Sequence, residues 1–360
     1  MNYTNKIHRF WGRLFRVGHW AEYRQRTVKQ RLRHIFAPLL LLISFSAAPA
    51  ATLPELTITV FAPPSQSIWI PALIKHLELD KKNGFKLTII PKPSNVAYTD
   101  FATGKDDFCY CAAIPAVSRF KQQGAKIALL WNVFNFESDI VLKDPAIRTI
   151  ADLQGKTLLT DTISGGWALS KWFFEQQGLD MKKLTVKSSS VRGADFLAEL
   201  QLDRVDALLV NPIEGAAAVA QGKGELHAIP VFNQALWKRV SGTDFVPQVT
   251  TGVSSDWIAK PENQDLARRF YQANREAAQF ISAHPQQAAA LVAQDARLDV
   301  PSMENVLRRY RNLIRIEPLA PHRRTIALLT QTLLPEAQLL PRPLTDEELT
   351  TLVPDFNVVR

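Results

Sequence analysis

From residue 56 onward, short β-type runs alternate with amphipathic helical stretches, and this alternation restricts the fold more than any other feature. The first set of expected strands covers residues 56–61, 85–90, 107–112 and 126–131. A second set covers residues 156–159, 184–187, 205–210 and 225–229. Strands that alternate with helices of this length form right-handed βαβ units and mostly parallel sheets. The sequence therefore predicts an α/β protein with two lobes.

The C-terminal part of the chain is predicted to be mostly helical. Segments rich in Ala, Gln and Arg have helical periodicity over residues 263–283, 285–294, 301–311 and 322–333. Helices that gather after two α/β sets indicate a tail that packs back onto the first lobe. The chain is expected to cross between the lobes near residues 137–142 and 247–254.

The positive charge of the chain belongs to its N-terminus. Residues 1–50 contain nine of the 43 Lys and Arg residues but one of the 34 Asp and Glu residues, so they carry +8 of the net charge of +9. The rest of the chain is nearly neutral. A nucleic-acid-binding protein would carry its basic residues on the folded body, so no nucleic-acid partner is expected.

Residues 29–50 follow the order that is typical of a secretory signal. A basic run at residues 29–34 precedes an apolar run at residues 35–47, and Ala48, Pro49 and Ala50 follow. A membrane-spanning helix needs ~20 apolar residues, and this run is shorter. Residues 1–50 are therefore predicted to be a signal peptide, cleaved near Ala50, that directs the protein to the periplasm. If the segment were retained instead, the chain would be a membrane-anchored sensor.

The loops that follow the expected strands are the candidate binding segments, because ligands of open α/β sheets bind beyond the carboxyl ends of the strands. Residues 161–167 (D-T-I-S-G-G-W) are the most informative of these loops. Gly165 and Gly166 let backbone N–H groups approach a ligand, and the helix dipole favours an anion there by ~0.3–1 kcal/mol. The same residues could equally form an ordinary N-cap with Ser164. No G-K-[ST] follows, so the segment is not a phosphate loop.

Other candidate ligand contacts could equally have an ordinary structural role. Ser65 lies between the first strand and its helix, where it could cap the helix or face a ligand. Arg192 follows three serines at a strand end and could pair with an anionic group. Five aromatic residues also cluster in the candidate loops and suggest a pocket wall for an apolar or ringed ligand: Trp69, Trp131, Phe134, Phe136 and Trp167.

The sequence shows no set of residues that points to catalysis. Cys109 and Cys111 are the only cysteines and lie on one face of a predicted strand, where a disulfide between them would be strained. They are therefore predicted to be buried free thiols. No nearby Cys or His completes a metal site, and neither a G-x-S-x-G nor an H-E-x-x-H motif occurs. We expect no metal, no cofactor and no catalytic residues.

Several of these segments together resemble one protein family. They are the first strand, residues 83–87 (N-G-F-K-L), 101–107 (F-A-T-G-K-D-D), 150–156 (I-A-D-L-Q-G-K), 162–166 (T-I-S-G-G), and 203–207 (D-R-V-D-A) with Pro212. Over about residues 55–290 the chain is similar to the periplasmic substrate-binding proteins of ABC importers for nitrate, sulfonates, taurine and pyrimidine precursors.

The resemblance implies a type II periplasmic-binding-protein fold with a two-segment hinge and a helical tail on the first lobe. Lobe one would comprise residues 51–137 and 253–360, and lobe two residues 138–252. The resemblance further implies ligand contacts, to which the aromatic cluster adds Trp167: Ser65, Gln66, Trp69, Ala112, Ser164, Gly165, Gly166, Arg192 and Asn211. Two positions depart from the family, because Cys109 and Cys111 flank a tyrosine where small residues are usual, and Asn211 replaces an aromatic or acidic residue. Because of these two departures, the resemblance does not identify the solute.

The expected function is that of a monomeric binding protein, not an enzyme. It would capture a small anionic solute with a partly apolar body by closing its lobes, and would deliver it to a membrane permease. The rival is an enzyme of the same fold that makes a pyrimidine precursor, with Cys109 and Cys111 as reactive groups or iron ligands. Export argues against such a biosynthetic enzyme.

Overall fold

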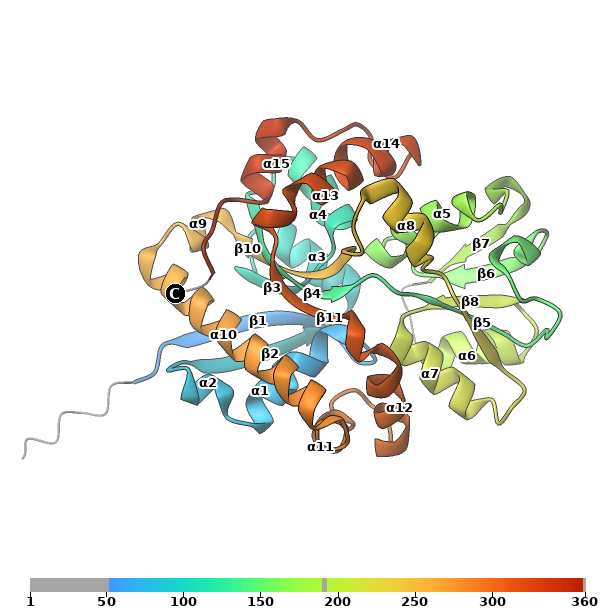
Figure 1. The fold of residues 1–360 in the computed structure, drawn as a ribbon, viewed down its shortest axis with the longest axis horizontal. Helices are drawn as coiled ribbons and strands as arrows, with labels where there is room; N and C mark the ends of the chain where they lie inside the picture. Colours follow the sequence, from blue (N-terminus) through green and yellow to red (C-terminus); the bar gives the residue numbers. More distant parts are fainter. Residues whose placement is uncertain (1–51, 190–192, 359–360) are drawn as a thin grey trace, which may run out of the picture. The chain divides into compact units, whose positions relative to one another are not determined.

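The computed structural model describes residues 52–189 and 193–358 of the chain (Figure 1). The predicted signal peptide at residues 1–50 and the predicted contact Arg192 lie outside these ranges. Among the described helices, none combines the length and the hydropathy that a membrane span requires.

The first lobe is built on a six-stranded sheet whose strands come from three separate parts of the chain. Its order is β11–β4–β10–β3–β1–β2. β1 pairs in parallel with β2 and β3, whereas β10 is antiparallel to β3 and β4, and β11 is antiparallel to β4. The strands are β1 (Glu55–Phe61), β2 (Lys86–Lys92), β3 (Phe108–Ala112), β4 (Ile127–Asn135), β10 (Pro247–Ser254) and β11 (Ile314–Pro318).

The second lobe is built on a five-stranded sheet from one continuous part of the chain. Its order is β7–β6–β8–β5–β9, in which β6 pairs in parallel with β7 and β8, and β5 is antiparallel to β8 and β9. The strands are β5 (Asp139–Leu142), β6 (Thr157–Thr160), β7 (Thr185–Ser188), β8 (Ala207–Val210) and β9 (His227–Pro230). The predicted two α/β lobes are therefore confirmed.

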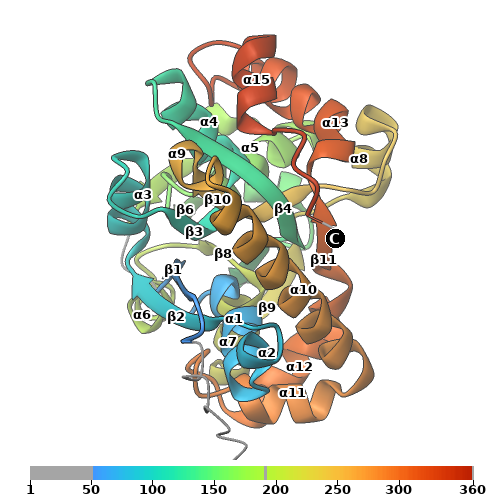
Figure 2. The same ribbon diagram turned by 90° about the vertical axis from the view of Figure 1, so that its left-hand side faces the viewer.

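Helices follow most of the parallel strands and then form the C-terminal part. They are α1 (Trp69–His76), α2 (Leu79–Lys82), α3 (Ser94–Ala102), α4 (Ile114–Gln122), α5 (Gly165–Gln176), α6 (Ala194–Gln201), α7 (Pro212–Gln221), α8 (Gln234–Ser241), α9 (Ser255–Ile258), α10 (Pro261–Ala283), α11 (Pro285–Val292), α12 (Val300–Tyr310), α13 (Arg323–Ala327), α14 (Leu334–Glu336) and α15 (Asp346–Leu352). A π-helix, Leu328–Leu333, continues α13. Figure 2 shows the long α10 crossing in front of the first sheet, with α1 and α2 beside it.

Two chain crossings join the lobes, and their positions agree only in part with the expected ones. Of the crossing expected near residues 137–142, residues 137 and 138 lie in the link between β4 and β5, and residues 139–142 form β5. Residues 247–254, the second expected crossing, form β10, and β11 was not expected at all. The crossings are the short link between β4 and β5 and the segment between β9 and β10. They pair with each other, because the N–H of Phe136 donates to the carbonyl of Val246 (2.7 Å) and that of Val231 to the carbonyl of Ser138 (2.9 Å). The lobe boundary expected at residue 253 falls inside β10, which pairs with the first sheet over its length.

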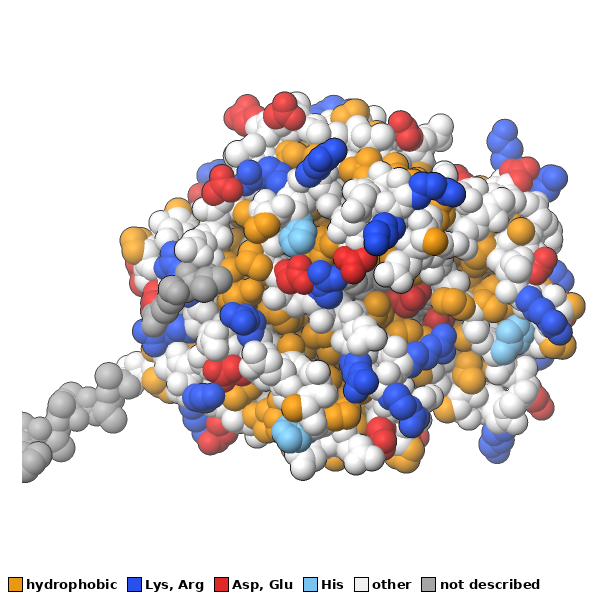
Figure 3. Space-filling model, viewed as in Figure 1, with side chains coloured by type: hydrophobic (Ala, Val, Ile, Leu, Met, Phe, Trp, Pro, Cys, Tyr) orange, Lys and Arg blue, Asp and Glu red, His pale blue; other side chains and the backbone are white. Residues whose placement is uncertain are grey.

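The C-terminal tail contacts both lobes. Its buried leucines share one hydrophobic cluster with α4 and α5, and α12 packs against α7 of the second lobe. Lys171 Nζ on α5 also donates to the carbonyl of Ala337 (2.9 Å). The expected packing on the first lobe is thus joined by contacts to the second. On the face drawn in Figure 3, basic and acidic side chains are interspersed.

Candidate functional site

A cavity of about 240 Å³ lies between the lobes, where strands of both sheets end. Its first-lobe wall comes from the segments after β1, β2 and β3, from α3 and from β10. Its second-lobe wall comes from the ends of β6 and β8 and from the first turn of α5. The lining residues are Phe61, Ala62, Pro63, Pro64, Ser65, Gln66, Pro93, Ser94, Tyr98, Cys111, Ala113, Ser138, Thr160, Asp161, Ser164, Gly165, Gly166, Trp167, Leu209, Val210, Asn211, Gln248 and Val249. This is the location that α/β topology favours for a ligand.

The first turn of α5 faces the cavity with free backbone donors. Ser164 Oγ accepts the N–H of Trp167 (3.1 Å) and donates to the carbonyl of Asp161 (2.8 Å), so its hydroxyl is used by the helix cap. Within the described residues, the N–H groups of Gly165 and Gly166 have no acceptor. A Cβ at Gly165 would lie inside the contact distance of the Ala113 Cβ in the first lobe. The absence of a side chain therefore lets α5 touch the start of α4.

Amide side chains contribute further donors. Gln66 is 4% exposed, lines the cavity, and its buried Nε2 has no partner among the described residues. Gln248, 8% exposed, lies opposite the first turn of α5, with its Nε2 3.2 Å from the position of a Gly166 Cβ. A buried donor without a partner costs ~1–3 kcal/mol. A solute with acceptor atoms would remove that cost.

Asp161 is the one charged residue among the described residues that line the cavity. Its Oδ1 accepts the N–H of Ile163 (3.2 Å), and its Oδ2 accepts the hydroxyl of Ser94 (3.1 Å) from the first lobe. Arg119 Nη2 adds a second bond between the lobes, to the carbonyl of Ile163 (3.0 Å). The carboxylate is thus already paired and helps to hold the lobes together.

The structure brings most of the predicted contact residues into the cavity walls. Asn211 caps α7, where its Oδ1 accepts the N–H groups of Ile213 (2.9 Å) and Glu214 (3.1 Å). Ser65 Oγ accepts the N–H of Ser67 (3.2 Å), which is also a capping role. The predicted residues in the walls are Ser65, Gln66, Ser164, Gly165, Gly166, Trp167 and Asn211.

Two predicted contacts lie behind the walls. Trp69 is 1% exposed and packs edge-on against Phe134 at 5.4 Å in the core of the first lobe. The side chain of Ala112 is buried, and its carbonyl accepts the hydroxyl of Thr250 (2.6 Å) inside the sheet. Neither residue lines the cavity, because β3 and α1 turn these side chains into the packed interior.

The aromatic wall differs from the expected one. Trp131, Phe134 and Phe136 are fully buried in the cores. The first two lie on β4, which is buried over its whole length, and Phe136, directly after it, stacks on Phe173 of α5 at 5.3 Å. Trp167 is joined in the wall by Phe61 and Tyr98, whose rings pack edge-to-face at 5.2 Å.

Tyr98 and Gln248 were missed for different reasons. Tyr98 lies in the middle of α3. An aromatic residue there fits the helical pattern equally well whether its side chain packs in the core or lines a cavity. Gln248 lies in a segment that was expected to be a crossing.

The prediction of two free thiols is wrong: Cys109 and Cys111 form a disulfide. The physical reason is a bulge. Thr250 pairs with Ala112 and Gly252 with Cys109, so β3 has one more residue than β10 between these pairs. A bulge bends the strand, and the Cα atoms of the two cysteines are 5.1 Å apart, within the range of disulfides. The thiols that would have supported an enzyme are therefore absent.

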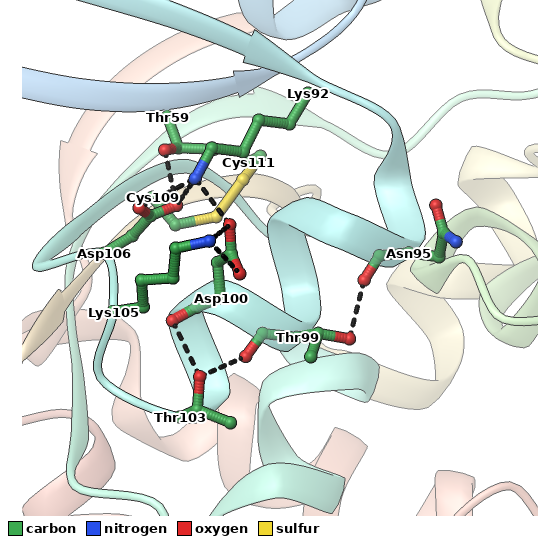
Figure 4. A network of polar contacts seen from close by, with 10 residues as sticks. All are labelled: Thr59, Lys92, Asn95, Thr99, Asp100, Thr103, Lys105, Asp106, Cys109 and Cys111. Carbon is green, nitrogen blue, oxygen red and sulfur yellow. Dashed lines mark hydrogen bonds and ion pairs between the residues drawn. A yellow bond between two sulfur atoms is a disulfide. The ribbon is translucent and has the colours of Figure 1, made fainter.

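A network of ion pairs lies beside the disulfide (Figure 4). Lys92 Nζ contacts Asp100 and Asp106, each at 2.7 Å, and the hydroxyl of Thr59 donates to Asp106 (2.7 Å). Lys105 adds a contact to Asp100 at 3.1 Å. These contacts tie β1, β2 and α3 to the start of β3 without using the cysteines.

We expect the double variant C109A/C111A to remain folded and to melt only a few degrees lower. The bridge closes a loop of three residues, and the chain-entropy relation gives about 1.6 kcal/mol for a loop that short. Circular dichroism melts of both proteins measure the difference. Loss of the folded state in the variant would contradict this prediction and give the disulfide a larger structural role.

The described residues contain no group of three or more His, Cys, Asp or Glu residues that could hold a metal ion. The polar groups around the cavity include the unpaired donors of Gln66 and of the first turn of α5, several hydroxyl groups, and the paired carboxylate of Asp161. This arrangement can bind a small molecule that offers acceptor atoms.

Comparison with known proteins identifies the family. The NMT1/THI5-like family model matches residues 81–288, more than half of the chain. The chain belongs to the NMT1/THI5-like family. The resemblance stated from the sequence is thereby confirmed. No curated protein matches this NMT1/THI5-like chain significantly.

Solved structures share the fold of this NMT1/THI5-like protein. The periplasmic aliphatic sulphonate-binding protein SsuA of Escherichia coli is 18% identical, with a TM-score of 0.63 over 85% of this chain and 94% of that one. The alkanesulfonate-binding SsuA of Xanthomonas axonopodis pv. citri, bound to MOPS, is 19% identical, with a TM-score of 0.64 over 81% and 96%. The periplasmic nitrate-binding protein NrtA of Synechocystis PCC 6803 is 14% identical, with a TM-score of 0.52 over 69% of both chains. The predicted periplasmic-binding-protein fold is confirmed.

Proposed function

We propose that this NMT1/THI5-like protein is the extracytoplasmic solute-binding component of an ABC importer. It captures a small anionic solute between its lobes and delivers it to a membrane permease. The cavity between the lobes and the fold shared with sulfonate- and nitrate-binding proteins support this proposal. It includes export with cleavage near Ala50 and action as a monomer.

The observation that carries the proposal is the excess of unpaired donors at the cavity. Gln66 Nε2 and the N–H groups of Gly165 and Gly166 have no acceptor among the described residues, whereas the carboxylate of Asp161 is already paired. Donors at a helix N-terminus favour an anion, by up to ~2 kcal/mol where they are partly buried. We include Arg192, predicted from the sequence, as the ionic contact.

The solute is proposed to be of the sulfonate, taurine or nitrate class. An oxyanion head would lie at α5 and Gln66. The rings of Phe61, Tyr98 and Trp167 line the same cavity and would contact an apolar body. The cavity, at about 240 Å³, is smaller than the ~300–1,000 Å³ typical of drug-sized ligands, which favours a small solute.

A thermal-shift panel on residues 51–360 tests the function. The panel contains nitrate, taurine, methanesulfonate, an aryl sulfonate, bicarbonate and a pyrimidine, after the protein is refolded from denaturant to remove carried solute. A solute at ~100 times its Kd stabilises the protein by ~2.7 kcal/mol, a clear shift in Tm. We expect a shift with at least one oxyanion, and about 10-fold or greater loss of its affinity in Gln66→Ala, because a hydrogen bond to a charged group contributes ~1.5–3 kcal/mol.

The matched control is Gln286→Ala. Gln286 is an exposed glutamine on α11 that bonds to Glu304, and its loss is expected to leave the affinity unchanged. A panel in which no oxyanion shifts the Tm would contradict the proposal.

A further inference from the structure

We propose that the Cys109–Cys111 disulfide holds the first-lobe wall of the cavity in its solute-binding shape, so that a small dithiol lowers the solute affinity by reducing the bridge. This inference rests on the proposed function and adds a redox control to it. Three features of the structure support it: the place of Cys111 at the cavity, the bulge that the bridge spans, and the contact that the following residues make with the other lobe.

The disulfide lies directly behind the cavity wall. Cys111 lines the cavity, whereas Cys109 is fully buried in an apolar cluster with residues of α3 and α4. Figure 4 shows the bridge beside the ion pair of Lys92 and Asp106. A small reagent that enters the cavity therefore reaches the bridge from the side of Cys111.

The chain around the first cysteine is held in place by side-chain contacts. Asp106 accepts hydrogen bonds from Lys92 Nζ (2.7 Å) and from the hydroxyl of Thr59 (2.7 Å). Tyr110, between the two cysteines, donates to Oδ1 of the buried Asn274 on α10. A change in the length of β3 is therefore passed forward, toward the start of α4.

The bridge spans a bulge in β3. Between the pairs Ala112–Thr250 and Cys109–Gly252, β3 has one residue more than β10. The Cα atoms of the two cysteines are 5.1 Å apart, whereas two residues of a regular strand span roughly 6.4–6.8 Å. Once the bridge is broken, no covalent bond keeps this stretch contracted, and it can lengthen by roughly 1 Å or more.

The residues after the bridge touch the other lobe at the proposed anion site. Ala113 is the N-cap residue of α4 and lines the cavity, and its Cβ lies 2.4 Å from the position of a Gly165 Cβ. Pro115 Cδ lies 3.4 Å from the same position. The groups of a binding site have to be held within roughly 0.5 Å of their productive geometry. A shift of roughly 1 Å at Ala113 therefore misplaces the first-lobe wall against the donors of α5.

Reduction of the bridge is a thiol–disulfide exchange with a dithiol. A thiolate of the dithiol attacks one sulfur of the bridge, and the second thiol then displaces the protein from the mixed disulfide. The products are two cysteine thiols and the cyclic disulfide of the reagent, so two electrons and two protons pass to the protein. Because disulfides form in oxidising compartments, the exported protein would gain its full solute affinity only after export.

Titration calorimetry of the oxidised protein and of protein kept in dithiothreitol tests the inference, with the oxyanion found in the thermal-shift panel. The reduced wild type is expected to bind about 10-fold or more weakly, because one misplaced hydrogen bond to a charged group has an effect of that size. Its circular dichroism spectrum should be unchanged, and reoxidation should restore the affinity. Equal affinities of the two forms would overturn the inference.

The variant C109A/C111A is the matched control, because it lacks the bridge and offers nothing to reduce. It should bind like the reduced wild type and should not respond to dithiothreitol. A variant that binds like the oxidised wild type would overturn the inference, since the bridge would then have only a structural role.

The solute should in turn protect the bridge. If the bridge raises the solute affinity by a certain factor, a saturating solute has to shift the dithiol–disulfide equilibrium toward the bridge by the same factor. Trapping of free thiols in defined mixtures of reduced and oxidised dithiothreitol measures this shift. An equilibrium that the solute leaves unchanged would overturn the inference.

An amide NMR spectrum of protein with isotope-labelled glycine, recorded without solute, separates this inference from the proposed function. Reduction is expected to shift the signal of Gly165, which touches Ala113, and to leave that of Gly178, which has open space around it just beyond the other end of α5. An unchanged Gly165 signal would overturn the inference. If the signal shifts but no oxyanion binds the oxidised protein, the proposed function fails, while the coupling of the bridge to α5 stands.

Discussion

A single added methyl group at Gly165 is expected to weaken solute binding by about 10- to 100-fold while the protein stays folded. A Cβ at this position meets the Cβ of Ala113, which lies on the opposite lobe. Overpacking of this kind costs ~1–3 kcal/mol, and 1.4 kcal/mol corresponds to a factor of ten in Kd. The cost falls on the closed state alone, because the two residues separate when the lobes open.

Titration calorimetry of Gly165→Ala with the solute found in the thermal-shift panel measures the loss. The decisive control is the double variant A113G/G165A, which moves the methyl group from one side of the contact to the other. Ala113 is the N-cap residue of α4, with a φ of −104°, a position where glycine is well tolerated. The double variant should regain most of the affinity. If it binds as weakly as Gly165→Ala alone, the contact between the lobes is not the cause.

The free energy of unfolding is expected to fall by a few kcal/mol as the pH rises from about 5 to about 8. Burial raises the pKa of Glu137 to about 8, and the nearby carboxylate of Asp139 adds to the shift. Burial also raises the pKa of Asp139 to about 6, although the Tyr310 hydroxyl (2.5 Å) and Arg309 oppose it. The folded state thus binds more protons than the unfolded chain between about pH 4.5 and pH 8. Its extra stability is complete below this window and is lost as the pH rises through it, at about 1.4 kcal/mol per unit of pKa shift.

Urea unfolding at pH 5 to 9 measures this loss, and Glu137→Gln assigns it. Glutamine keeps the oxygen that accepts from Ser138 and Phe232 but has no proton to lose. The variant is expected to lose the pH dependence between pH 6 and 8 and to keep the part below pH 6 that belongs to Asp139. The exposed Glu225 provides the control Glu225→Gln, which should behave as the wild type. An unchanged slope in E137Q would contradict the assignment.

Most of the parallel strands could be predicted because each is a short apolar run followed by a helix. The strands β5, β10 and β11 could not, because none of them is a plain apolar run: β5 begins with Asp139, β10 begins with Pro247 and Gln248, and β11 contains Arg315 and Glu317. Asp139 illustrates the difficulty. A carboxylate at the start of a fully buried strand is tolerated because Tyr310, 171 residues later, donates a hydrogen bond to it. Nothing near residue 139 in the sequence reveals that partner.

In the candidate site, too, features with a local sequence pattern could be predicted, whereas features that depend on distant contacts could not. The first turn of α5 was predictable, because glycines at the start of a helix have a local meaning. The disulfide was not, since it depends on a bulge that exists only when β3 pairs with β10. Gln248 depends on two contacts, with Glu137 and with the first turn of α5, and both are far away in the sequence.

The C-terminal tail sets a limit on the range of motion that two crossings alone would not set. Tyr310 bonds to Asp139 in the second sheet, Arg309 lies 3.6 Å from the same carboxylate, and Lys171 on α5 binds the carbonyl of Ala337. The tail therefore adds a third connection between the lobes: it holds Asp139, directly after the link between β4 and β5, and it holds α5 through Lys171. Opening the cavity must either break these contacts or move part of the tail together with the second lobe. The tail therefore limits how far the two lobes can separate.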